Sequence, residues 1–289
     1  SFGETVVEGD LTVQSSGADI TQRQLAASTI DSTLRVAGDV DVTAANMVLD
    51  HVNAFDGAVS LTTSGNVTLA ADGAIDFGVS SIGGDLTATS VNGMTQSGAM
   101  AVTGATTLST GFDADVLLGN VGNDFGGLLR VADGRDVVVT DASALAIAGT
   151  TLRNLTASAG GALSVGGLTV GNDLSLTGNT ITNTSTDILA VTGKTTMAAT
   201  GTITLDNLHQ FGGAVGVTSG SDLTLHDTNA LELSGVDISG DLTLTVDGAI
   251  TQSAGSSMLV GGAADVVTTG GADVTLNEVA NDFGGVLSL

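Results

Sequence analysis

Short runs in which aliphatic and polar residues alternate recur along the whole chain. An aliphatic residue, an outward Thr and a second aliphatic residue make up the segments 11–13, 67–69, 223–225 and 242–244. This period of two is typical of a β-strand with one buried face. Gly-Asp or Gly-Asn pairs precede most of these runs, where we expect a positive φ at Gly and a local turn closed by the Asx side chain. No segment of ten or more residues has helical apolar spacing, so the pattern predicts an all-β protein.

Two sequence elements repeat at wide intervals, which is the signature of a repeat architecture. The first is a Phe-Gly motif, whose members include Phe2, Phe55, Phe125 with Gly127, Phe211 with Gly213, and Phe283 with Gly285. The Phe residues are spaced by 53, 70, 86 and 72 residues, all close to whole multiples of about 17 to 18. The second element, Ile-Thr-Gln or a close variant, stands at 20–22, 94–96, 181–183 and 250–252. The chain is therefore predicted to consist of units of about 17 to 18 residues.

A unit of this length holds about three short strands and three corners, too little to bury its own aliphatic face. Stacked in parallel on its neighbours at about 4.8 Å per coil, it forms a β-solenoid that buries this face. We expect about 16 such coils in a single continuous domain, residues 1–289, with each motif Phe packing at a wider place in the bore. A β-propeller is the alternative, but its antiparallel blades leave the shorter repeat unexplained.

Composition narrows the range of partners. The chain has 31 acidic and 6 basic residues, which give a formal net charge of −25. Such a charge repels phosphate groups and anionic lipid, so we expect neither nucleic-acid binding nor membrane insertion. There is no Cys, which excludes disulfides and thiolate chemistry.

Several motifs are similar to those of large secreted bacterial proteins built from β-strand repeats. They are Asn-Asp-Phe-Gly-Gly at 123–127 and 281–285, Ile-Thr-Gln-Ser at 250–253, and the Gly-Asp-Leu-Thr strand starts. In these the chain resembles filamentous haemagglutinin and other two-partner-secretion exoproteins over nearly its whole length. The resemblance implies a right-handed β-helical shaft that is exported and displayed at the cell surface or released as a fibre, and hence an extracellular protein.

The sequence shows no pattern for catalysis. His51, His209 and His226 form no zinc-binding motif, and we interpret all three as solvated surface residues. Polysaccharide lyases and glycosidases also use β-solenoids, but here only Arg130 and Arg135 among the basic residues lie near each other. No long loop interrupts the repeat to form the wall of a cleft with two facing carboxylates. We therefore predict that the protein is not an enzyme and has no cofactor, with calcium as the alternative.

Calcium is considered because of the many carboxylates at predicted corners. Asp222 and Asp241 fall at corners of neighbouring units, where their oxygen atoms are candidate ligands of a shared divalent cation. The competing interpretation is that these Asp residues cap turns while diffuse counterions screen their charge.

The sequence favours a structural role: the shaft of an adhesin, or a filament at the cell surface or in a biofilm matrix. The motifs at Phe2 and Phe283 are related, so we expect either end-to-end stacking of copies or membership of a longer chain. The alternative is a binding module whose outward Thr, Ser and Asp residues contact a glycan or a host receptor. Ice binding would need an uninterrupted Thr array, which the sequence lacks.

Overall fold

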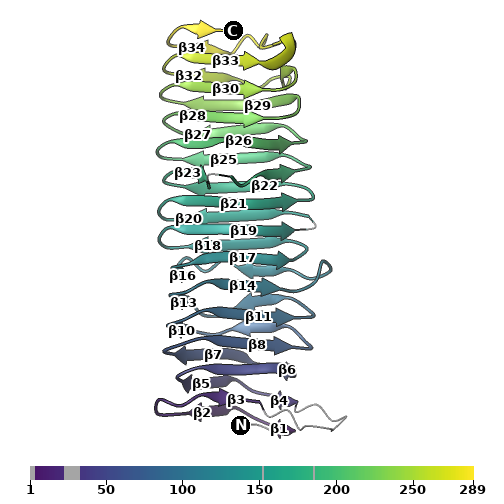
Figure 1. Ribbon diagram of the computed structural model, residues 1–289, viewed down its shortest axis with the longest axis vertical. Coiled ribbons are helices and arrows are strands. Elements are labelled where there is room, and N and C mark those ends of the chain that lie inside the picture. The colour runs from purple at the N-terminus through teal and green to yellow at the C-terminus, as the bar shows by residue number, and fades with distance from the viewer. Residues whose placement is uncertain (1–3, 23–32, 152, 185) are drawn as a thin grey trace. The chain divides into compact units, whose positions relative to one another are not determined.

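The computed structural model describes residues 4–22, 33–151, 153–184 and 186–289. Contacts divide the chain into two compact units, Ser1–Leu145 and Ala146–Leu289. In each unit the strands of successive coils stack in parallel (Figure 1), and the two units together hold about 13 turns of β-solenoid. The predicted all-β solenoid is therefore confirmed. Among the described residues, no helix is long and apolar enough to cross a membrane.

The elements are short strands and one 3₁₀ turn. The first unit contains β1 (Thr5–Val7), β2 (Leu11–Gln14), β3 (Ile20–Thr21), β4 (Leu34–Val36), β5 (Val40–Ala44), β6 (Met47–Phe55), β7 (Ala58–Thr63), β8 (Val67–Ala71), β9 (Ile75–Phe77), β10 (Ser80–Ile82), β11 (Leu86–Ser90), β12 (Met94–Gln96), β13 (Met100–Val102), β14 (Thr106–Ser109), β15 (Val116–Leu118), β16 (Asp124–Phe125), β17 (Leu128–Asp133) and β18 (Val137–Asp141). The second contains β19 (Leu145–Thr151, which starts one residue earlier), β20 (Leu155–Ala159), β21 (Leu163–Val170), β22 (Leu174–Gly178), β23 (Ile181–Asn183), β24 (Leu189–Val191), β25 (Thr195–Ala199), β26 (Ile203–Phe211), β27 (Val215–Ser219), β28 (Leu223–Asp227), β29 (Leu231–Ile238), β30 (Leu242–Val246), β31 (Ile250–Gln252), β32 (Met258–Val260), β33 (Ala264–Thr268), η1 (Thr269–Gly271), β34 (Asp282–Phe283) and β35 (Leu287–Ser288).

Alternation along each strand builds the core. In β5, Val40 and Val42 are buried, whereas Asp41 and Thr43 are exposed. Val40 also pairs in register with Val59 of the next coil, so buried aliphatic side chains form columns that run from coil to coil. Burial of one such side chain contributes about 1.5–3 kcal/mol, which makes these columns the main source of stability.

Some coils hold the three strands that the sequence predicted, and these three strands lie in two sheets. In the coil that contains β9, β10 and β11, the first two strands follow each other in one sheet and the third lies in the other. The core of each unit therefore lies between two parallel sheets. Aliphatic side chains fill most of this layer, together with Met residues and several Phe rings.

The coils are longer than predicted, and about 13 turns replace the expected 16. Leu163 pairs with Ile181, 18 residues further on. Thr106 pairs with Leu129, 23 residues further on. Mid-strand register shifts, as between β14 and β17 or between β26 and β28, take up extra residues. The intervals between Phe motifs include these residues, so dividing the intervals by the shortest repeat gives too many coils.

Corner glycines are required by the close approach of successive coils. A Cβ atom on Gly127 would lie 2.5 Å from the carbonyl oxygen of Gly104 in the preceding coil, and Gly213 and Gly285 meet backbone in the same way. Gly84, which belongs to a Gly-Asp pair, would bring its Cβ within 2.7 Å of backbone and is not at a positive φ. The expected positive φ before the strands is therefore wrong, because the neighbouring coil and not the turn excludes a side chain.

Replacing Gly127 by Ala should destabilise the first unit by about 1–3 kcal/mol, because the backbone of the preceding coil cannot move aside without strain. Gly73→Ala is the matched control, since no atom lies within 4 Å of a Cβ at that corner. Urea unfolding midpoints of the two variants measure the difference. Equal midpoints would contradict the role of close approach.

Candidate functional site

Asp and Asn side chains at the corners bond one coil to the next. Oδ1 of Asp222 accepts a hydrogen bond from the backbone N–H of Asp241 at 2.8 Å, and Oδ1 of Asp241 accepts one from that of Ala263 at 2.8 Å. The same bond is made by Asp10, Asp39, Asn46, Asn66, Asp85, Asn154 and Asp173. These bonds run between coils, whereas the sequence pattern suggested bonds within a turn.

Asp222 and Asp241 are the residues for which the sequence suggested a shared calcium ion. They do lie at the same corner of neighbouring coils, and Oδ1 of each already accepts a backbone N–H. Within the described ranges, no group of three or more His, Cys, Asp or Glu side chains is placed to hold a metal ion. Calcium at this corner stays a prediction.

Most motif Phe residues lie in the core. Phe125 and Phe211 are 1% exposed and Phe55 is 7% exposed, whereas Phe283 is half-buried. Phe2 lies outside the described residues. Each of these four described rings follows, by two positions, a polar residue that bonds to a neighbouring coil, and the candidate site is built from these polar residues.

Asn123 is fully buried and forms a reciprocal pair with Gln96. Nε2 of Gln96 donates to Oδ1 of Asn123 at 2.8 Å, and Nδ2 of Asn123 donates to Oε1 of Gln96 at 3.0 Å. Gln96 ends β12, and Asn123 precedes β16 in the following coil. We call this pair of side-chain amides the amide brace.

The brace also supplies partners to backbone groups. Oδ1 of Asn123 accepts the N–H of Met100 at 3.0 Å, and its Nδ2 donates to the carbonyl oxygens of Leu118 and Thr140, each at 3.1 Å. Met100, Leu118 and Thr140 belong to β13, β15 and β18, which lie in three successive coils. One buried Asn therefore joins three coils, at a place where the chain bulges out of the strand ladder.

The same brace occurs near both ends of the chain. Nε2 of Gln252 donates to Oδ1 of Asn281 at 2.7 Å, and Nδ2 of Asn281 donates back to Oε1 at 2.8 Å. Gln22 and Asn53 form the same two bonds. In both braces Oδ1 of the Asn also accepts a backbone N–H from the preceding coil.

A fourth joint of this kind contains His209 in place of Asn. Its Nδ1 atom accepts the backbone N–H of Leu189 at 3.0 Å, so the ring proton is assigned to Nε2, which lies 3.4 Å from Oδ1 of Asn183. His209 is 0% exposed, so the expectation of a solvated surface histidine is wrong for this residue. Burial lowers the pKa of His209 to about 4, against the opposing effect of the Asp206 carboxylate.

Asp227 is a second buried titratable group at this joint. It lies on β28 in register with His209 and is 0% exposed. Its Oδ1 accepts the N–H groups of Phe211 at 3.3 Å and Asn229 at 3.1 Å, while Oδ2 has no hydrogen-bond partner among the described residues. Burial raises the pKa of Asp227, although the backbone hydrogen bonds act in the opposite direction.

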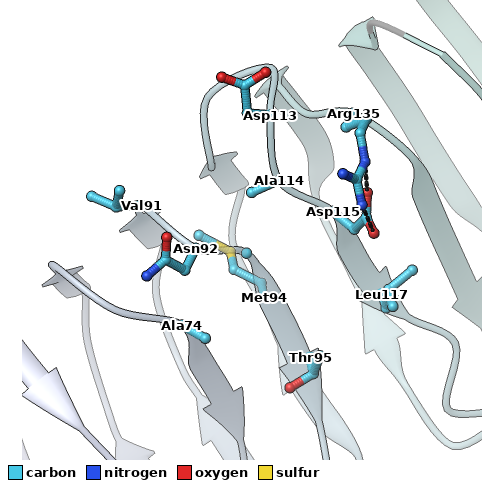
Figure 2. Close-up of a pocket in the computed structure, with 11 residues that line it drawn as sticks. Ala74, Val91, Asn92, Met94, Thr95, Asp113, Ala114, Asp115, Leu117 and Arg135 are labelled. Atoms are coloured by element: carbon cyan, nitrogen blue, oxygen red, sulfur yellow. Dashed lines mark hydrogen bonds and ion pairs between the residues drawn. The ribbon is translucent and has the colours of Figure 1, made fainter.

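A shallow pocket of about 290 Å³ lies beside the loop that precedes β15 (Figure 2). Asn92 and Met94 line one side, and Asp113 stands on the loop. The guanidinium of Arg135 donates from Nε and Nη2 to the two carboxylate oxygens of Asp115, at 2.8 and 2.7 Å. The guanidinium of Arg135 and the carboxylate of Asp115, both in the lining of the pocket, are therefore paired across neighbouring coils.

Both halves of the brace are visible in the sequence, but their pairing is not. Each Ile-Thr-Gln element is followed along the chain by a Phe motif, and a polar residue always stands two positions before the Phe. The regular succession of an amide in one motif and a polar residue in the next is the signal for a contact. The interval between the two varies too much to predict which atoms meet.

Comparison with known families divides the chain into four repeats. Residues 1–62, 64–132, 152–218 and 220–289 each match a family described as "Repeats of unknown function (DUF5649)". No curated protein and no solved structure matches the chain. Each matched repeat contains one joint, namely Gln22–Asn53, Gln96–Asn123, Asn183–His209 and Gln252–Asn281.

Replacing Asn123 by Ala should lower the free energy of unfolding by about 3 kcal/mol or more, because several buried hydrogen-bonding groups lose their partner. Asn92→Ala, at an exposed position of the same unit, is the control and should change stability by less than about 0.5 kcal/mol. Urea unfolding measures both. Similar losses in the two variants would show that the brace contributes little.

Replacing Asp227 by Asn should stabilise the protein at pH 7, because burial disfavours the charged carboxylate in the folded chain. Its raised pKa means that this penalty is present above the folded pKa and disappears as the pH falls below the ordinary value of 3.8. The gain in urea midpoint should therefore shrink between pH 7 and pH 3.5.

The control for Asp227 is Asp141→Asn. Asp141 is also buried, but Oδ2 accepts the N–H of Phe125 at 2.7 Å and Oδ1 accepts two bonds from Ser143. This variant should be destabilised at pH 7. A loss of stability in Asp227→Asn at pH 7 would contradict the prediction.

Proposed function

Because this chain belongs to the DUF5649 repeat family, we propose that it is a structural protein: the β-solenoid shaft of a secreted adhesin, or of a filament at the cell surface or in the extracellular matrix. A shaft holds other parts at a distance and must resist unwinding at every coil. Four family repeats with the same kind of internal joint suit that role.

The observation that carries the proposal is that polar side chains of this chain bond mainly from coil to coil. Corner Asp and Asn residues accept backbone N–H groups of the next coil, as Asp85 does from Ala105 at 2.8 Å. Buried amides such as Asn123 join three coils. A catalytic or transport protein would use some of its buried polar groups to face a cleft, whereas these support stacking.

Composition supports a place outside the cell. The net charge of −25 keeps like chains apart at low ionic strength, and salt at about 0.1 M screens this repulsion beyond about 10 Å. A chain with no Cys is also insensitive to the redox state of its compartment. Both properties suit a shaft that works in changing extracellular conditions.

A row of outward hydroxyl groups supports a second function, the binding of a glycan or a receptor. Thr204 pairs with Thr224, and Thr224 pairs with Thr243, in successive coils. Thr182 continues the row in the preceding coil. Hydroxyl groups donate and accept hydrogen bonds, and their repeat of about 4.8 Å offers an ordered set of contacts to a ligand with hydroxyls of its own.

Deletion of residues 65–126 tests the shaft. Gly65 and Gly127 occupy the same corner column, so joining Ser64 to Gly127 removes three coils in phase and sets Leu129 in the place of Val67. The shortened chain should fold, with a β-sheet circular dichroism spectrum and a cooperative urea transition.

Deletion of residues 65–115 is the out-of-phase control. It joins Ser64 to Val116 and brings a strand of one sheet into the place of a strand of the other sheet, so this variant should not fold.

Antibody labelling of intact cells that produce the protein tests its location. Labelling only after lysis, or failure of the 65–126 deletion to fold, would contradict the proposed function.

A further inference from the structure

The third family repeat, residues 152–218, differs from the other three in its joint. Asn53, Asn123 and Asn281 each stand two residues before a motif Phe, and His209 stands there in the third repeat. The Asn side chain in three repeats and the His side chain in the third repeat each accept a backbone N–H at this place. Of the two, only the imidazole gains a proton between pH 7 and pH 4. The third repeat therefore carries a titratable acceptor at a buried joint.

The joint depends on an unprotonated Nδ1 atom. Nδ1 of His209 accepts the N–H of Leu189, the first residue of β24, at 3.0 Å. A second ring proton would sit on Nδ1, so two donors would face each other and the hydrogen bond would be lost. His209 and Leu189 are both 0% exposed, and water cannot replace the missing acceptor without opening the coil.

Titratable groups on β26, on β28 and in the turn before β24 surround the imidazole of His209. Asp206, on the same strand, favours protonation of His209, whereas His226 on β28 disfavours it. Asp227 on β28 lies in register with His209 and is itself buried. Asp187 lies in the turn before β24, where its backbone oxygen accepts a side-chain hydrogen bond from β26. Burial outweighs the attraction of Asp206, and the pKa of His209 falls to about 4.

We propose that His209 is an acid-operated release for the joint between β24 and β26, which opens when its ring is protonated while the three amide-braced repeats stay closed. Strand β24 has only three residues. Its register pairs with β26 are Ala190 with Gln210 and Val191 with Phe211. Loss of the Leu189 hydrogen bond therefore frees the start of a strand that has few other bonds to β26.

The sign of the effect follows from proton linkage. In the opened coil His209 has a pKa near its ordinary 6.5, and in the closed coil it has one of about 4. Protons therefore bind preferentially to the open form between these two values, and acidification through this window favours opening. Asp227 acts in the opposite direction, because its raised pKa means that protonation favours the closed form.

Hydrogen exchange of the Leu189 amide, measured by NMR on the full chain at pH 7.0 and pH 4.5, tests the proposal. After correction for intrinsic exchange, its protection factor should fall in the native protein by less than the roughly 50-fold change that His209 alone would give, because protonation of Asp227 opposes the fall. The Met100 amide, which donates to Asn123, is the internal control and should keep its protection. In His209→Asn, which installs the residue of the other repeats, Leu189 protection should not fall on acidification and should rise as Asp227 takes up a proton.

Two further variants separate His209 from its neighbours. His226→Asn should retain the fall in Leu189 protection, and Asp227→Asn should enlarge it, because the carboxyl group that opposes opening is gone. A smaller fall in Asp227→Asn than in the native protein would show that the carboxyl group drives the response and would overturn the proposal. An unchanged Leu189 protection factor in the native protein, or an equal fall in His209→Asn, would also overturn it.

The native protein alone also decides the question if His209→Asn does not fold. Nitrogen chemical shifts of the His209 ring should show the Nε2–H tautomer at pH 7 and titration well below pH 6.5. Titration of the folded protein near pH 6.5 would overturn the proposal, because the closed coil would then take up a proton without penalty.

Discussion

The spacing of about 4.8 Å between paired strands governs this structure, because every residue paired in the strand ladders has a counterpart at that distance in the next coil. At the corners the backbones of successive coils meet, and Gly127 lies where any Cβ would collide with Gly104. Beside such glycines, an Asp or Asn is short enough to reach the backbone N–H of the next coil, as Asn66 does to Asp85 at 2.9 Å. The abundance of Gly, Asp and Asn at corners thus follows from stacking.

The same spacing explains the buried polar groups. A bulge places extra residues outside the strand ladder, and their backbone groups need partners because unpaired buried groups are costly. Asn123 and Gln96 supply those partners from side-chain amides, which carry both donors and acceptors. The brace therefore lets a long coil be inserted among shorter ones while its buried backbone groups keep partners, and one joint of this kind, amide or imidazole, stands in each family repeat.

The joint at Asn183 and His209 shows what such a position tolerates. An imidazole reproduces the acceptor of Asn through Nδ1 and the donor through Nε2, so the coil closes in the same way at neutral pH. It cannot reproduce the insensitivity of an amide to pH. The joint therefore carries a titratable imidazole acceptor where the other three carry a neutral amide. Among four similar repeats, this makes one joint chemically different from the rest.

The sequence by itself determined the all-β class and the aliphatic columns, because alternation as in the segment Val67–Ala71 requires a buried and an exposed face. It also determined the parallel stacking, because a short repeated unit cannot bury its aliphatic face alone. It also revealed both motifs of the brace. It did not determine the length of a coil, since bulges such as that between Leu205 and His209 leave the intervals uneven. Nor did it distinguish a buried His209 from a surface histidine. Only the tertiary structure decided these. Burial and hydrogen bonding depend on which residues of the next coil lie opposite, and every bulge or corner along the chain shifts that register.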